Sequence, residues 1–349
     1  MTAPTASVAV PLVPFVLFFT MQTTPPKFIV AMIADDRNQL PAWVTQRLDA
    51  IPNLEVRYAR CRTEEQLLAI AADADMIWTR HLNFVLTPEV LPKLTRCKAI
   101  FRSGSGMDGY PIEEAAKLGI HCCNSPESIS ESVAEHAVSL LFSFIRQIPQ
   151  ANDAIHAHKT FQLSDMRWHI SGRTLGLVGF GRIARRVVEM VAGFRMRILC
   201  FDPFANPQTM RDMNVQPVSL EELLKESDYV SLHCPLTDDT FHLIGEKEFA
   251  MMKMNTVLVN TSRGDVVDEE ALVTALQKKR IGGAAIDVTH IEPLPPDSPL
   301  LELPNLIVTP HNAAFSSDFE KNFYELSIQV ITECQRGDYS HSMNKHLMK

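Results

Sequence analysis

Glycine is scarce in this sequence: the chain has fourteen glycines among 349 residues, about 4 % against an average near 7 %. The scarcity excludes collagen-like and glycine-rich disordered proteins. A hydrophobic fraction of 46 % and a charged fraction of 21 % are typical of a globular chain with material for a core. At roughly 100–200 residues per domain, the length predicts two domains.

Basic charge is also lacking. The net charge is −8, the isoelectric point is near 5.8, and the longest local run of cations is Lys278-Lys279-Arg280 at the end of an expected helix. Nucleic-acid binding needs a basic stripe that neutralises phosphates. The sequence therefore predicts no nucleic-acid partner.

Paired cysteines are absent. The seven cysteines are odd in number and form no C-x-x-C pair, which argues against a disulfide framework or a zinc ribbon. His156 and His158 have metal-ligand spacing, but no further ligand types cluster near them, so no metal is expected. Unpaired thiols are typical of a reducing compartment, and we predict a cytoplasmic protein.

No hydrophobic run is long enough to span a membrane, which takes about 20 residues. The longest, Val8–Met21, has fourteen residues and is interrupted by Pro11 and Pro14. A secretory signal needs a positive start, and no Lys or Arg precedes Lys27. We expect residues 1–20 to be a disordered extension or to precede the true start, and no membrane partner; a targeting role is the alternative.

Short apolar runs alternate with amphipathic stretches along most of the chain. Such alternation predicts βαβ units and an α/β fold with parallel sheets covered on both faces. The expected strands are Lys27–Ile33, Ala74–Thr79, Lys98–Arg102, Thr174–Val178, Arg197–Phe201, Tyr229–His233, Thr256–Asn260, Gly283–Asp287 and Leu306–Thr309. A long helix with a capping box at Ser128 and Glu131 is expected over Ser128–Ile148, then a connecting segment over Gln150–Gly172, and a last helix over Phe319–Cys334.

One glycine-rich turn predicts a dinucleotide site. Gly179-Phe180-Gly181-Arg182-Ile183-Ala184 has the pattern G-x-G-x-x-A, and it lies between an apolar strand and an expected helix. The next strand ends in Asp202, close to the spacing of about 20 residues at which an acid binds the ribose hydroxyls. A carboxylate there would repel a 2′-phosphate, so the turn favours NAD over NADP.

Three polar residues follow later strands: Arg263, Glu292 and His311. Ligands of open α/β sheets bind outside the carboxyl ends of the strands, so we expect these side chains to converge on one crevice. A guanidinium matches a carboxylate, and an imidazole titrates near neutral pH. The set is suited to acid–base chemistry on a carboxylic acid.

Together these segments resemble the D-isomer-specific 2-hydroxyacid dehydrogenases over roughly residues 74–337. Val133-Ala134-Glu135-His136 and His233-Cys234-Pro235-Leu236-Thr237 add to the resemblance. It implies two Rossmann-like, doubly wound parallel-sheet domains: a discontinuous substrate domain of residues 21–126 plus 313–349, and an NAD-binding domain of residues 127–312. It also implies a homodimer formed through the cofactor domains, with the Val133–Ile148 helix in the interface.

The resemblance assigns chemical roles as well. Arg263 would clamp the substrate carboxylate, His311 would be the general acid or base, and Glu292 would hold the imidazole, while hydride moves between the nicotinamide and C2 of a 2-hydroxy or 2-keto acid. The substrate would be bound by Ser105, Gly106, Arg263 and His311. The NAD contacts would be Gly179, Gly181, Arg182, Ile183, Asp202, Cys234, Pro235, Thr240, Thr261, Ser262, Arg263, Asp287, His311 and Ala314.

The chain departs from the usual family pattern at Gly109-Tyr110-Pro111-Ile112 and at Ala314, which leaves the acid substrate open. An NADH-responsive corepressor on the same fold is one alternative function. A formate dehydrogenase would carry Gln in place of Glu292, whereas a phosphite dehydrogenase would share the Arg-Glu-His set. Eight of the fourteen glycines lie in or beside the expected site, at positions 104, 106, 109, 172, 176, 179, 181 and 264.

Overall fold

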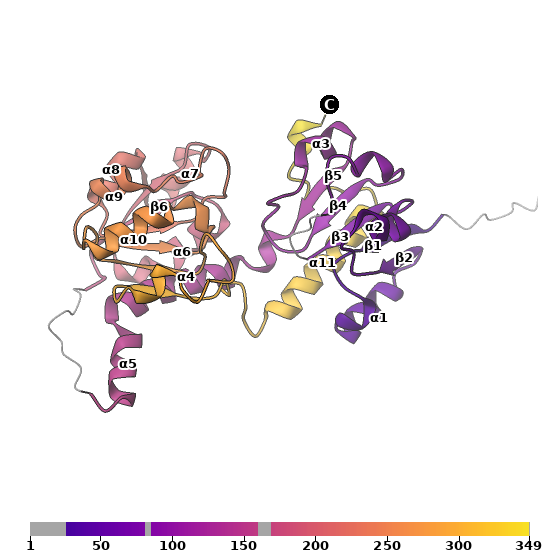
Figure 1. Ribbon diagram of the computed structural model, residues 1–349. Coiled ribbons are helices and arrows are strands. Elements are labelled where there is room, and N and C mark those ends of the chain that lie inside the picture. Colours follow the sequence, from indigo (N-terminus) through magenta and orange to yellow (C-terminus); the bar gives the residue numbers. More distant parts are fainter. Residues whose placement is uncertain (1–25, 81–84, 160–168, 349) are drawn as a thin grey trace, which may run out of the picture.

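The computed structural model describes residues 26–80, 85–159 and 169–348, and these residues build two parallel sheets that lie in separate lobes (Figure 1). One sheet has five strands in the order β2-β1-β3-β4-β5, and the other has seven in the order β12-β11-β10-β9-β6-β7-β8. Helices pack on both sheets, so the predicted α/β fold with two Rossmann-like units is confirmed. The predicted extension, residues 1–20, lies outside the described residues.

The lobe of the five-stranded sheet is built from both ends of the chain. Its strands are β1 (Phe28–Met32), β2 (Leu54–Tyr58), β3 (Met76–Thr79), β4 (Ala99–Arg102) and β5 (His121–Asn124), and the helices in its lobe are α1 (Ala42–Asp49), α2 (Glu64–Ala71), α3 (Ile112–Lys117) and α11 (Phe319–Gln335). Phe323 and Ile331 of α11 share one buried cluster with Val30 and Phe101 of the strands. The last expected helix is thereby confirmed.

The seven-stranded sheet is continuous in sequence. Its strands are β6 (Thr174–Val178), β7 (Arg197–Phe201), β8 (Val215–Pro217), β9 (Tyr229–Leu232), β10 (Val257–Asn260), β11 (Gly283–Ile286) and β12 (Leu306–Val308). Its helices are α4 (Ser130–Arg146), α5 (Ile148–His156), α6 (Arg182–Val191), α7 (Pro207–Asp212), α8 (Leu220–Glu226), α9 (Glu246–Met251) and α10 (Glu269–Gln277). Residues of α4 and α6 bury one face of the sheet, and residues of α8, α9 and α10 bury the other.

The helix expected over Ser128–Ile148 is wrong at both ends. Ser128 lies in a 3-10 turn, where its hydroxyl donates to the carbonyl of Ser125 at 2.7 Å, so it does not cap the helix. At the other end, Gln147 adopts a left-handed conformation with φ 52° and separates α4 from α5. Because α5 is helical through His156, the segment expected to be a connection over 150–172 is also wrong in its first part.

Three strands were not predicted from the sequence: β2, β5 and β8. Each pairs with one neighbour only and therefore lies at a sheet edge. An edge strand buries less apolar surface than a central one, so its sequence needs fewer consecutive apolar residues. β2 is half-buried throughout, and β8 has only three residues.

The strand order places the crevice of each sheet. In the seven-stranded sheet the chain proceeds from β6 toward β8 on one side and from β9 toward β12 on the other, so the order reverses between β6 and β9. The five-stranded sheet reverses between β1 and β3. Ligands bind outside the carboxyl ends of strands at such a switch point. Among the described helices, none is long and apolar enough to cross a membrane.

Candidate active site

The glycine turn lies at the switch point of the seven-stranded sheet. Gly179 has φ +94°, and a Cβ on it would lie 2.9 Å from backbone atoms of His233 and Cys234 at the end of β9. Only glycine combines this conformation with so close an approach. At Gly181, where α6 begins, a Cβ would meet no atom within 4 Å. The free helix N-terminus and this open space fit the pyrophosphate of a dinucleotide.

Asp202 borders this turn at the end of β7. Its Oδ2 accepts the N–H of Phe180 at 2.8 Å, and its Oδ1 accepts the N–H of Phe204 at 2.8 Å and of Ala205 at 3.0 Å. The carboxylate is therefore fixed beside the glycine turn, where the sequence places the ribose. Two further predicted cofactor contacts lie at the start of α6. Arg182 forms an ion pair with Glu127 at 2.5 Å, and Ile183 packs against the hydrophobic core.

The loop after β9 forms the opposite wall of the crevice. Burial lowers the pKa of His233 to about 4, so the ring is neutral, and its Nε2 lies 2.9 Å from the hydroxyl of Ser231. Burial also raises the pKa of the Cys234 thiol to about 11. The Thr240 hydroxyl donates to the carbonyl of Pro235 at 2.7 Å and closes the loop on itself. These residues shape the crevice without a charge of their own.

Arg263 and its neighbours follow β10. The buried Asn260 side chain donates to the Arg263 carbonyl at 2.8 Å and accepts the N–H and hydroxyl of Ser262 at 3.0 and 2.8 Å. The hydroxyl of Thr261 is buried without a hydrogen-bond partner among the described residues. This hydroxyl lies at the carboxyl ends of the strands, where the glycine turn also lies. A buried hydroxyl without a partner there can form a hydrogen bond with a bound cofactor.

His311 and Glu292 form the second polar group of this edge. Nδ1 of His311 lies 2.6 Å from Oε2 of Glu292, whose Oε1 also accepts the N–H of Thr289 at 3.2 Å. His311 is 51 % exposed and adopts φ +50°, an uncommon conformation for a residue with a Cβ. The carboxylate orients the ring and leaves Nε2 free to exchange a proton.

Asp287 holds the His311 loop in place. Its oxygens accept the hydroxyl of Thr309 at 2.5 Å and the N–H groups of Asn312 and Ala313 at 3.0 and 2.9 Å. Burial alone would raise the pKa of Asp287, but hydrogen bonds from His136, Thr309 and the two amides lower it below its usual range. Asp287 is 1 % exposed. It therefore holds the backbone of the loop from His311 to Ala313 in place, a structural role that the sequence did not suggest.

The loop after β4 in the other lobe carries the predicted substrate amides. Asn124 donates to the carbonyl of Ser105 at 2.7 Å, and the N–H of Gly104 donates to the Ser125 hydroxyl at 2.9 Å. A Cβ on Gly106 would collide first with Nη2 of Arg263 and would lie 2.7 Å from Oδ2 of Asp108. The structure thus brings this loop against Arg263, although the two are far apart in the chain.

Asp108 is the site residue that sequence reasoning missed. Nε and Nη2 of Arg263 both donate to its Oδ2, at 3.0 and 2.8 Å. The sequence did offer a signal, because an acid stands two residues after Gly106 in the substrate loop. The pairing itself spans 155 positions, and no local pattern predicts such a contact.

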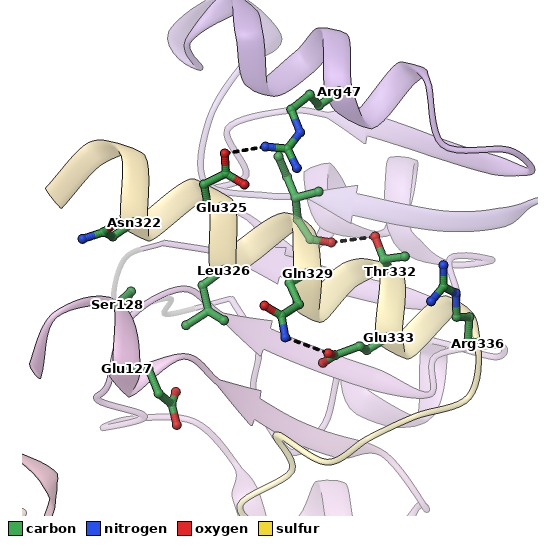
Figure 2. A pocket seen from close by; sticks show the side chains of 11 residues that line it. Arg47, Glu127, Ser128, Asn322, Glu325, Leu326, Gln329, Thr332, Glu333 and Arg336 are labelled. Carbon is green, nitrogen blue, oxygen red and sulfur yellow. Dashed lines mark hydrogen bonds and ion pairs between the residues drawn. The ribbon is translucent and has the colours of Figure 1, made fainter. Parts of the chain in front are cut away.

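A groove of about 550 Å³ lies elsewhere, along α11 (Figure 2). It is lined by α11, by Arg47 of α1 and by Glu127 and Ser128, and Arg47 pairs with Glu325 across it at 2.5 Å. None of the predicted site residues lines it. We place the site at the strand ends instead, because the polar groups suited to catalysis converge there.

The described residues contain no cluster of three or more His, Cys, Asp or Glu arranged to hold a metal ion. They do contain the groups expected of a nicotinamide dinucleotide site. These are the glycine turn, the carboxylate of Asp202 that is expected to bind the ribose, and the side chains of Arg263, Glu292 and His311. Two Rossmann-like units and such a site define an NAD-dependent oxidoreductase.

The comparisons identify the family. Residues 138–313 match the family model described as D-isomer specific 2-hydroxyacid dehydrogenase, NAD binding domain. The glyoxylate reductase of Korarchaeum cryptofilum is 35 % identical over 298 residues, covering 83 % of this chain and 85 % of that protein. D-3-phosphoglycerate dehydrogenase of Methanocaldococcus jannaschii is 37 % identical over 83 % of this chain, which spans 55 % of the relative's length.

Solved structures agree with this family. A glyoxylate reductase from Paecilomyes thermophila superposes with a TM-score of 0.83 at 26 % identity, covering 92 % of this chain and 99 % of that one. The chain therefore belongs to the D-isomer-specific 2-hydroxyacid dehydrogenase family. It is an NAD-dependent oxidoreductase that transfers hydride at C2 of a 2-hydroxy or 2-keto acid.

Proposed function

We propose that the protein interconverts small 2-keto acids, such as glyoxylate or hydroxypyruvate, and their D-2-hydroxy acids, with Arg263, Glu292 and His311 as its catalytic set. The observation that carries the proposal is the 2.6 Å pair of His311 and Glu292 on the sheet edge that also bears Arg263. The resemblance to a glyoxylate reductase over 83 % of the chain supports a small substrate.

In this proposal each side chain has one task. The guanidinium of Arg263 binds the substrate carboxylate through paired N–H groups. Nε2 of His311 gives a proton to the substrate oxygen during reduction and takes it back during oxidation. Glu292 binds Nδ1, which fixes the orientation of the ring. Bound NADH supplies the hydride that reaches C2.

The cofactor contacts are proposed at the fourteen residues that the sequence indicated, from Gly179 to Ala314. The open helix N-terminus at Gly181 and the fixed carboxylate of Asp202 support this assignment. We also propose the domain boundaries at residues 126/127 and 312/313, since α4 begins shortly after the first and the return to the other lobe follows the second.

The experiment is a panel of 2-keto acids. NADH oxidation is followed at fixed enzyme concentration with glyoxylate, hydroxypyruvate, pyruvate and phenylpyruvate, and NADH binding is measured separately by its fluorescence. We expect turnover with at least one small acid. Bound NADH without turnover on any of them contradicts the proposal and favours a binding protein that senses NADH.

We further propose a homodimer that forms through the cofactor domain and works in a reducing, cytoplasmic compartment. The apolar side chains of the helix expected in the interface, such as Leu140 and Phe144, are buried in the core of their own lobe, so the interface is proposed at α5 instead. Helix α5 extends away from its lobe (Figure 1), and its Ile148 and Ile155, seven positions apart, are 54 % and 67 % exposed. All seven cysteines are free thiols, which supports the compartment. Light scattering should give twice the chain mass of 39.1 kDa, and the mass of one chain contradicts the dimer.

A further inference from the structure

Arg263 has three of its N–H donors engaged before any substrate binds. Nε and Nη2 donate to Oδ2 of Asp108 at 3.0 and 2.8 Å, and Nη1 donates to the carbonyl of Ser262 at 2.7 Å. A guanidinium has five N–H bonds, so one remains on Nη1 and one on Nη2. The remaining N–H of Nη2 faces the end of the side chain, because Oδ2 of Asp108 accepts from the Nε–Nη2 edge, and this end is where a guanidinium can bind a carboxylate.

The guanidinium also lies directly against the substrate loop. A Cβ added to Gly106 would collide with Nη2 of Arg263. It would also lie 2.7 Å from Oδ2 of Asp108 and 2.8 Å from Nη1 of Arg102. Asp108 therefore sets Arg263 beside the loop amides expected to share the substrate carboxylate. A bulkier residue at position 106 would push the guanidinium away.

Asp108 is the carboxylate that lies with the two guanidinium groups of Arg102 and Arg263 around Gly106. Arg102 donates to the Gly106 carbonyl, and its Nε is buried with no hydrogen-bond partner in the part of the chain that the structure describes. Burial lowers the pKa of Arg102, and the nearby charge of Arg263 lowers it further, while Asp108 raises it. Without Asp108, two guanidinium groups would face each other across Gly106.

The site thus contains two basic side chains, His311 and Arg263, that are each oriented by a carboxylate, and the two pairs differ in origin. Glu292 and His311 both belong to the lobe of the seven-stranded sheet. Asp108 and Arg263 belong to different lobes, since Asp108 follows β4 and Arg263 follows β10. The orientation of Arg263 consequently depends on the approach of the two lobes.

We propose that Asp108 is a positioning residue: it holds the Nε–Nη2 edge of Arg263 across the cleft, so that Arg263 presents its free end to the substrate carboxylate only when the lobes lie together. The inference rests on the proposed function of Arg263. If Asp108 merely occupied the place of the substrate carboxylate, its removal would increase the affinity for substrate. If Asp108 positions Arg263, its removal decreases that affinity, so an experiment can separate the two cases.

The test compares Asp108→Asn with the wild-type enzyme. Four quantities are measured: the KM and kcat for glyoxylate, the dissociation constant Ki of oxalate as an unreactive carboxylate, obtained by titrating the enzyme–NADH complex and following NADH fluorescence, and the Kd of NADH. We expect KM and Ki to rise roughly ten- to hundredfold, because a charge-assisted pair that orients Arg263 is lost, while the Kd of NADH changes less than about twofold. Asp108→Glu keeps the charge and should recover part of the loss.

A double-mutant cycle and a matched control separate positioning from folding. In Arg263→Lys, which has no Nε–Nη2 edge to orient, adding Asp108→Asn should change the Ki of oxalate less than about twofold. Asp73→Asn removes the carboxylate from another Asp–Arg pair, with Arg57 at 2.5 Å, and should change neither KM nor Ki.

Several results would overturn the inference. An unchanged or lower Ki in Asp108→Asn would mean that Asp108 is a bystander or a competitor of the substrate. An equal effect of the mutation in the Arg263→Lys background would show that it acts elsewhere, and a parallel loss of NADH binding and melting temperature would assign it a structural role. Absence of turnover in the wild-type enzyme with NADH bound would instead refute the proposed function. The titration with oxalate needs no turnover, so it would still test the role of Asp108.

Discussion

The two lobes build their parts of the site in different ways. On the side of the seven-stranded sheet, hydrogen bonds within one lobe hold the loops: Asn260 fixes Ser262 and the backbone of Arg263, and Glu292 accepts the N–H of Thr289. On the other side, the loop over residues 103–109 depends on contacts with distant residues, including Arg263. The backbone of the first side can form independently, whereas the pairing of Arg263 with the loop of the other lobe is completed only when the lobes meet.

This difference implies that cofactor binding and substrate binding fail separately. A change on the cofactor side should act on NADH affinity or on chemistry without disturbing the opposite loop. A change at the substrate loop should act on the affinity for the acid. The following predictions test this separation in order of decreasing effect.

Replacing His311 with Ala should lower kcat about 10²- to 10⁴-fold, because the substitution removes the imidazole that is proposed to exchange the proton. The Kd of NADH should change less than about threefold, since the glycine turn and Asp202 are untouched. Steady-state kinetics and a fluorescence titration measure the two quantities. A comparable loss of NADH affinity would show that His311 belongs to cofactor binding and not to proton transfer.

Replacing Gly179 with Ala should raise the Kd of NADH at least about tenfold. The new Cβ would lie 2.9 Å from the backbone of His233 and Cys234, so the turn must move. Gly119→Ala is the matched control: Gly119 has φ +73° but nothing within 4 Å of the new Cβ. It should cost about 1–2 kcal/mol of stability and leave NADH binding unchanged. Equal effects of the two substitutions would contradict the close approach as the cause.

Asp202→Asn should relax the preference for NAD over NADP about tenfold, because it removes the charge that repels a 2′-phosphate. The amide oxygen can still accept the N–H of Phe180, although the N–H groups of Phe204 and Ala205 then lose their acceptor. The ratio of kcat/KM for NADH and NADPH measures the effect. If that ratio does not change, Asp202 does not face the ribose.

The smallest effect concerns the ion pair of His290 and Asp265, which joins the Glu292 loop to the Arg263 loop. The hydrogen bond with Asp265 raises the pKa of His290 above its ordinary 6.5. The pair therefore adds stability fully below about pH 6.5 and loses it as the pH rises through the raised pKa.

His290→Gln should lower the melting temperature by at most about 2 °C at pH 6, because the pair is exposed, and by less at pH 9. Thermal melts of the mutant and the wild type across this range measure the difference. A difference that grew with pH would have the wrong sign for a pair of charged His and Asp.

The sequence predicts most of the framework and the chemistry of one side. The glycine turn and Asp202 form a local sequence pattern, and the central strands are continuous apolar runs. Both can therefore be predicted from short stretches of the sequence. The edge strand β2 was missed because its side chains are only half-buried, and the break at Gln147 was missed because a left-handed conformation at Gln leaves no periodic signal. The support of the His311 loop by Asp287 was missed because it depends on hydrogen bonds to residues beyond the next strand.

By itself the sequence determined the α/β class, the nucleotide turn, and the order of Arg263, Glu292 and His311 along the strand ends. Strand and turn propensities act over a few residues, and the carboxyl ends of parallel strands share one edge, so local information is sufficient there. Only the tertiary structure decided that Asp108 meets Arg263 and that Gly106 lies against the same guanidinium. Those contacts join two lobes across 155 positions of the chain, and only the packing that places the lobes specifies them.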